Sequence, residues 1–79
     1  MPNVFRSGPY RFFFFSNEGS EPLHIHVEAS GKYAKFWILP VRYDSSTGFR
    51  AHELAEIRRI IEENESLIQQ KWNEFFANA

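Results

Sequence analysis

The hydrophobic pattern of this chain changes its period near residue 50, and that change limits the folds open to it. Before residue 50, short apolar runs alternate with turn residues. The runs are Asn3–Arg6, Tyr10–Ser16, Leu23–Glu28 and Tyr33–Leu39. They are rich in Phe, Val, Ile and Tyr, which favour strands, and their short connections favour antiparallel neighbours. The first half therefore predicts a small antiparallel sheet.

The fourth run ends at a proline, and the stretch that follows it is polar. Pro40 ends this run or marks a sheet edge, because proline donates no hydrogen bond to a ladder. Val41–Tyr43 can extend the strand region, and Asp44–Gly48 has the composition of a loop. We therefore expect the strands to end at residue 43.

The second half carries a helical stripe. Its apolar residues are spaced by three, four and seven, and they are Leu54, Ile57, Ile61, Ile68, Trp72 and Phe75, widened by Ile60, Leu67 and Phe76. A single helix of about 26 residues would be roughly 39 Å long, which is long for this sheet. Asn64 interrupts the stripe. We therefore expect a bend or break within Glu63–Ser66.

Together these patterns predict an α+β fold. We expect a small antiparallel β-sheet of three to four strands, followed by a C-terminal helical region packed on one face. The chain of 79 residues fits a single domain, 1–79, with strands in 1–43 and one or two helices in 50–77.

Composition narrows the classes of function. The chain has no cysteine, so disulfides and thiolate metal sites are excluded. Its net charge of −1 argues against general polyanion binding but allows a local basic patch. No apolar run is long enough for a membrane span, and we expect a cytoplasmic protein. Nine Phe, three Tyr and two Trp exceed what so small a core can hide, which favours a homo-oligomer.

One strand concentrates the residues that could do chemistry. In Leu23–Glu28, side chains alternate between faces, so His24, His26 and Glu28 share one face and Leu23, Ile25 and Val27 the other. If the apolar face packs on the helices, the first set lies on an open face. We expect the same open face to carry Arg11, Tyr33, Lys35 and Trp37.

Basic residues interleaved with rings are typical of sheets that bind single-stranded RNA, because bases stack and cations hold phosphates. Two histidines on such a surface suggest RNA cleavage, with His24 and His26 exchanging protons with the ribose 2′-hydroxyl and the leaving oxygen. Lys35 or Arg11 could stabilise the charged phosphorane, and Glu28, Tyr33 and Trp37 complete the expected substrate-binding set. This route uses no metal or cofactor, and we assign none.

Two other interpretations stay open for this face. His-x-His beside a carboxylate occurs in mononuclear metal sites. However, His24, His26 and Glu28 spread over about 13 Å along one strand and cannot all reach one ion unless the strand bends. The face could also be a solvated surface whose polar residues keep the protein in solution.

The sequence also resembles a known family. Its recurring segments are Met1–Arg6, Gly8–Glu18, Glu21–Val27, Ala34–Trp37 and Trp72–Phe76. Together they resemble the small bacterial family catalogued as domain of unknown function 4160. Members are commonly encoded beside another small protein, in two-gene modules that look like toxin–antitoxin pairs. The resemblance implies a toxin-like or antitoxin-like role and a partner from the neighbouring gene, and it supplies no catalytic residues.

This chain departs from the family pattern at two positions. Leu23 stands where a second proline is common, and Arg50 stands where a serine that caps the helix is common. The second change predicts that Thr47 or Ser46 starts the helix instead.

The leading hypothesis is a toxin-like RNA-binding protein that, if it is an enzyme, is a metal-independent ribonuclease acting through His24 and His26. The alternatives are a non-enzymatic antitoxin or protein-interaction module, and a small metalloprotein.

Overall fold

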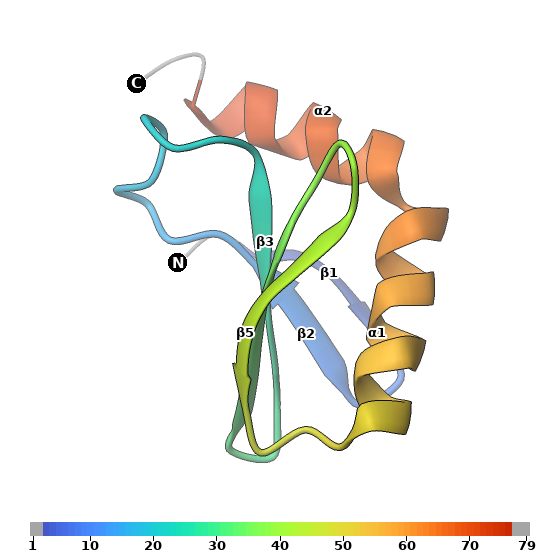
Figure 1. Ribbon diagram of the computed structural model, residues 1–79. Coiled ribbons are helices and arrows are strands. Elements are labelled where there is room, and N and C mark those ends of the chain that lie inside the picture. The colour runs from blue at the N-terminus through green and yellow to red at the C-terminus, as the bar shows by residue number, and fades with distance from the viewer. Residues whose placement is uncertain (1–2, 77–79) are drawn as a thin grey trace.

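The computed structural model describes residues 3–76, which form five strands followed by two helices (Figure 1). The strands are β1 (Asn3–Ser7), β2 (Tyr10–Phe13), β3 (His24–Ala29), β4 (Lys32–Trp37) and β5 (Arg42–Thr47), and the helices are α1 (Ala51–Glu63) and α2 (Glu65–Phe76). The predicted α+β class is confirmed. Positions 1, 2 and 77, the outer limits of the predicted strand and helix regions, lie outside the described residues.

The five strands form one sheet in the order β1-β2-β3-β4-β5, and each neighbouring pair is antiparallel. Gly8 and Gly31 lie in the short turns between β1 and β2 and between β3 and β4, whereas residues 14–23 form a longer connection between β2 and β3. Between β3 and β4, Ala29 pairs with Lys32 across the two residues Ser30 and Gly31, both with positive φ. This is the backbone geometry of a tight hairpin turn, which glycine adopts without strain.

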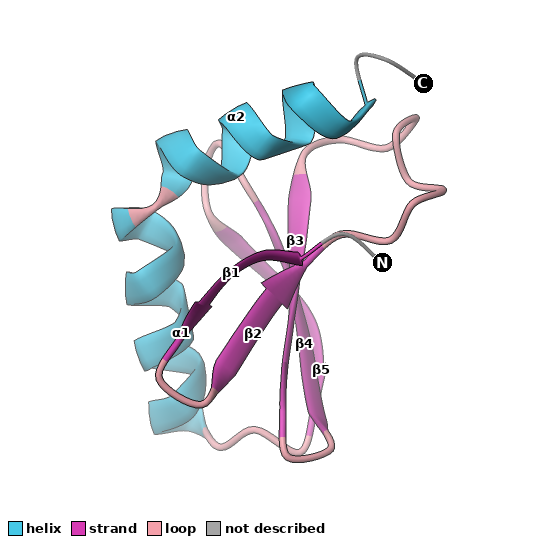
Figure 2. Ribbon diagram, turned by 180° about the vertical axis from the view of Figure 1, so that it is seen from behind, coloured by secondary structure: helices cyan, strands magenta, loops and turns pink. Residues whose placement is uncertain are grey.

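α1 lies on one side of the sheet, α2 crosses the end at which β3 begins, and the chain bends sharply between them (Figure 1 and Figure 2). The bend falls at Asn64, within the predicted interval. The Asn64 side chain donates to the Ile60 carbonyl at 2.8 Å, and its backbone N–H donates to Ile61 at 3.0 Å. These bonds use two carbonyls at the end of α1 that would otherwise lack helical partners.

The core lies between this side of the sheet and the helices. From the sheet it takes Tyr10, Phe12, Phe14, Ile25, Val27, Ala34, Phe36 and Ile38, and from the helices Ile57, Ile60, Ile61, Ile68 and Trp72. The predicted inward faces of the strands are therefore confirmed. Leu54 is only half-buried and packs at the margin of the core.

Two details differ from the sequence prediction. The pattern predicts three to four strands ending at residue 43, whereas β5 continues to Thr47. β5 is an edge strand whose residues are polar and largely exposed, so no apolar alternation marks it. The helix starts after Arg50 rather than at Thr47 or Ser46, because Glu53 accepts the Arg50 backbone N–H at 2.8 Å.

Candidate functional site

His24 and His26 lie two residues apart on the face of β3 that points away from the main core, and both are buried. Their exposed fractions are 0% and 2%. The sequence pattern places them on an open face, but other rings cover them. Trp72 of α2 packs on His24 with ring centroids 5.2 Å apart, and Phe15 packs on His26 at 4.5 Å.

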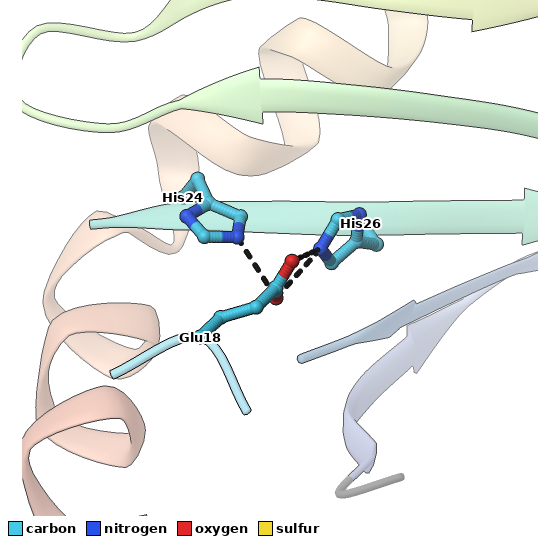
Figure 3. A group of neighbouring side chains, drawn as sticks. All are labelled: Glu18, His24 and His26. Carbon is cyan, nitrogen blue, oxygen red and sulfur yellow. Dashed lines mark hydrogen bonds and ion pairs between the residues drawn. The ribbon is translucent and has the colours of Figure 1, made fainter. Parts of the chain in front are cut away.

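A carboxylate from the connection between β2 and β3 meets both rings. Glu18 Oε1 lies 2.9 Å from His24 Nε2 and 2.8 Å from His26 Nε2, and its Oε2 lies 2.9 Å from His26 Nε2. Figure 3 shows the Glu18 side chain reaching the strand between the two imidazoles. The three side chains thus form one buried cluster, which we call the Glu18 cluster.

The fold holds Glu18 in place from several sides. The Phe15 backbone N–H donates to Glu18 Oε1 at 3.1 Å, and the Glu21 N–H donates to the Glu18 carbonyl at 3.0 Å. Gly19 packs so closely on Phe76 of α2 that a β-carbon there would lie 2.7 Å from the ring. Any larger residue at position 19 would therefore require the Phe76 ring to shift.

The other ring nitrogen of each histidine also has a partner. His24 Nδ1 lies 2.8 Å from the Pro22 carbonyl oxygen, which can only accept, so this nitrogen carries the proton. His26 Nδ1 lies 2.6 Å from the Tyr33 hydroxyl, which can donate or accept. The tautomer of His24 is thus fixed by the backbone, whereas His26 can change tautomer together with Tyr33.

Burial and charge act in opposite directions on the Glu18 cluster. Burial raises the pKa of the Glu18 carboxyl, but hydrogen bonds from His26 and from the Phe15 N–H outweigh it, so the pKa lies below its ordinary value. Burial lowers the pKa of the His26 imidazole, and His24 and Lys35 add to this although Glu18 opposes it. The preferred state therefore has an ionised Glu18 and a neutral His26.

Arg11 and Glu28 lie on the same face but form a separate pair. The register places Arg11 opposite Glu28, and the Arg11 guanidinium donates to Glu28 Oε1 at 3.1 and 2.7 Å. Arg11 also lies over the Phe13 ring at 4.3 Å and donates to Asn3 at 2.6 Å. Glu28, the carboxylate that the sequence pattern groups with the histidines, is thus bound by an arginine.

Lys35, Trp37 and Tyr33 line β4 beside the histidines. Lys35 is opposite His26 and Trp37 is opposite His24 in the register. The Lys35 ammonium lies over the Trp37 ring at 4.4 Å and 3.5 Å from Glu21, and Trp37 Nε1 donates to Asp44 at 3.0 Å. Of these predicted residues, Tyr33 alone is hydrogen-bonded to a member of the Glu18 cluster.

The sequence reasoning missed Glu18. It lies in a polar turn, Asn17–Ser20, where a charged residue is normally solvated. The sequence did hold one clue to Glu18. It precedes the His-x-His strand in the connection from β2, and that connection must pass the end of the strand. The donor atoms of Glu18, His24 and His26 all lie within 4.8 Å of one another, so they can share a proton or a metal ion.

Comparison with known proteins gives one match. The model of a family described as "Domain of unknown function (DUF4160)" matches residues 10–73. No curated protein and no solved structure matches the chain. Among the described residues, no helix has the length and apolar character needed to cross a membrane.

Proposed function

The chain belongs to the family described as a domain of unknown function (DUF4160), and we propose that it is a toxin-like, cytoplasmic protein that binds single-stranded RNA. Its binding surface is the outer sheet face, defined as Arg11, Glu28, Tyr33, Lys35 and Trp37. Its partner is a small protein encoded by a neighbouring gene.

The pairing of cations with rings on this face carries the proposal. Arg11 lies over Phe13 on β2, and Lys35 lies over Trp37 on β4, at 4.3 and 4.4 Å from the ring centroids. Aromatic rings stack on bases and cations hold phosphates, which is how sheet surfaces bind single strands without reading their sequence. Tyr33 and Trp37 are partly exposed and can stack on bases.

Two glutamates on this face now pair with the cations that RNA phosphates would have to bind. Glu28 pairs with Arg11, and Glu21 lies 3.5 Å from Lys35. Both glutamates are about half-exposed, with side-chain exposures of 50% and 46%. Their partners Arg11 and Lys35 are only 16% and 18% exposed, so a phosphate must displace these carboxylates to reach the two cations.

The second part of the proposal is that His24 and His26 cleave the bound RNA. Cleavage requires that the RNA can reach the two imidazoles. Both Nε2 atoms face Glu18, so the 2′-hydroxyl reaches them only when the carboxylate moves aside. The Glu18 connection would then act as a cover over the two imidazoles.

RNA binding tests the proposal through charge-neutralising variants. Lys35→Gln and Arg11→Gln should each weaken binding of a single-stranded oligoribonucleotide and lower the salt slope by about one. Arg59→Gln is the matched control, because Arg59 is 60% exposed on α1 and pairs with Glu63. Wild-type protein that fails to bind RNA, or an Arg59 variant that weakens binding equally, would refute the proposal.

Exposed apolar residues favour a second candidate function, that of a protein-interaction module. Its partner would be another protein or a second copy of this chain. Leu39, Tyr43 and Phe75 are 54%, 49% and 39% exposed. Tyr43 borders an apolar hollow of about 280 Å³ beside α1. Size-exclusion chromatography with light scattering, with and without the neighbouring gene product, distinguishes a homo-oligomer and a hetero-complex from a lone monomer.

A further inference from the structure

We propose that the Glu18 cluster is a binding site for a divalent transition-metal ion of the zinc type, with Glu18, His24 and His26 as its protein ligands. The site adjoins the outer sheet face through Tyr33 and uses the two histidines proposed for cleavage, but Arg11 and Lys35 are not among its ligands. The proposal therefore does not depend on RNA binding.

The buried Nε2 atom of His24 indicates a bound cation. Its ring is fully buried, and Nδ1 donates to Pro22. In the neutral ring, Nε2 is then a bare lone pair that faces a carboxylate oxygen only 2.9 Å away. Two acceptors this close repel each other unless a cation lies between them.

A proton on His24 Nε2 would be one such cation, but the contact between Nε2 and Glu18 does not have the direction of a hydrogen bond. Despite the 2.9 Å separation, Nε2 has no aligned hydrogen-bond partner among the described residues. Hydrogen bonds weaken steeply when they are bent. A metal ion needs no such alignment, because it lies off the line that joins the two ligand atoms.

The three ligand atoms lie close enough together for small side-chain movements to bring them around one ion. A tetrahedral zinc ion with bonds of about 2.0–2.1 Å holds its ligand atoms about 3.3 Å apart. The three donor groups lie within 4.8 Å, and the nitrogen–oxygen distances are 2.8 to 2.9 Å. To bind one ion, the Glu18 side chain would move outward and the two imidazoles would turn toward each other.

The outer hydrogen bonds are those that metal-binding histidines require. Such histidines donate their second N–H to a carbonyl or another acceptor, which fixes the ring. His24 already donates to Pro22, and His26 can donate Nδ1–H to the Tyr33 oxygen once Nε2 binds the ion. Tyr33 therefore holds the ring in both states.

The ligand types select the class of ion. Two imidazoles and one carboxylate suit zinc and its first-row neighbours, whereas calcium and magnesium prefer sets made of oxygen ligands. Three protein ligands leave one position for water or another small ligand. Because Glu18 comes from the connection and both histidines from β3, the ion would also fasten the connection to the sheet.

The test is calorimetric titration of the whole chain with Zn²⁺, after treatment with a chelator. We expect one ion per chain. Glu18→Gln and His24→Gln should each weaken binding at least tenfold, because losing a ligand costs at least as much as losing an outer hydrogen bond, about 10–100-fold.

Two variants serve as matched controls. Glu21→Gln removes a carboxylate of the same connection that approaches the other side of the His24 ring, at 3.9 Å from Nδ1. His52→Gln removes an exposed histidine on α1. Neither should change the affinity for Zn²⁺.

A measurement on the wild type keeps the test decisive if a ligand variant does not fold. Co²⁺ should give the intense visible absorption of a four-coordinate site, and Mg²⁺ should not displace it. Wild-type protein that binds neither Zn²⁺ nor Co²⁺ would overturn the proposal. So would binding that a folded Glu18→Gln variant retains in full or that His52→Gln abolishes.

Discussion

Replacing Glu18 with alanine tests how much the Glu18 cluster stabilises the fold. The substitution leaves the buried Nε2–H of His26 without its acceptor, and a hydrogen bond to a charged group contributes about 1.5–3 kcal/mol. It also removes the acceptor of the Phe15 N–H, a bond of about 0.5–1.5 kcal/mol. Water can reach part of the space, because the Glu18 side chain is 12% exposed. We therefore expect a loss of about 2–4 kcal/mol.

For a domain of this size, the whole free energy of unfolding is about 4–12 kcal/mol. The loss should lower the melting temperature by about 10–25 °C. The assay is urea unfolding at neutral pH with excess EDTA, followed by tryptophan fluorescence, because Trp72 packs directly on His24. EDTA keeps any metal contribution out of the measurement.

Glu21→Ala is the control for this experiment. Glu21 lies in the same connection, but it is 46% exposed and makes ion pairs only at 3.5 Å or more. Its loss should cost less than about 0.5 kcal/mol. If Glu18→Ala is no more destabilising than Glu21→Ala, the cluster does not hold the connection on the sheet.

Four further predictions concern the core, the stability in acid, the stability in alkali, and catalysis. Ile61→Ala should cost about 2–5 kcal/mol in urea unfolding, because Ile61 is fully buried. Acid should destabilise the protein in two pH ranges. Because the pKa of folded His26 is lowered, stability falls as the pH drops below the ordinary histidine pKa of 6.5, and because the pKa of folded Glu18 is lowered, it falls again below the ordinary glutamate pKa of 4.5. Glu18→Gln should therefore reduce the loss of stability in the lower pH range. Burial and the Glu56 bond raise the pKa of Tyr10 to about 12, so its contribution is present below pH 10 and lost toward pH 12, a decline that Tyr10→Phe should reduce in alkaline melts. If His24 and His26 are an acid–base pair on RNA, replacing either with Ala should lower cleavage by about 10²–10⁴-fold in an assay that contains EDTA, whereas equal cleavage by the double variant would exclude them.

The sequence was sufficient for the elements whose burial is periodic. The stripe through Ile57, Ile61 and Ile68 is apolar because it faces the sheet, so its period predicts the helical region. Asn64 predicts the bend because a polar residue in the stripe can use its side chain as a cap. The alternation in β3 likewise predicts that Ile25 and Val27 face the core.

The sequence was insufficient where long-range contacts decide the structure. β5 pairs with one neighbour only, so its polar residues give no alternation that a pattern could detect. The burial of His24 depends on Trp72, which is distant along the chain. Glu18 reaches the histidines because the path of a connection brings it there, and a connection has no period. The pattern therefore located the two histidines but grouped them with Glu28, which pairs with Arg11, whereas Glu18 is the carboxylate that meets the two rings.

The most direct test of the Glu18 cluster is the long-range ¹H–¹⁵N NMR spectrum of the histidine rings, recorded for the wild type and for Glu18→Gln. We expect His24 to carry its proton on Nδ1, because that atom donates to the Pro22 carbonyl. We also expect the substitution to shift the Nε2 signals of both His24 and His26. The exposed His52 should not change. An unprotonated Nδ1 on His24, or a substitution that leaves either Nε2 signal in place, would contradict the claim that one carboxylate joins the two histidines.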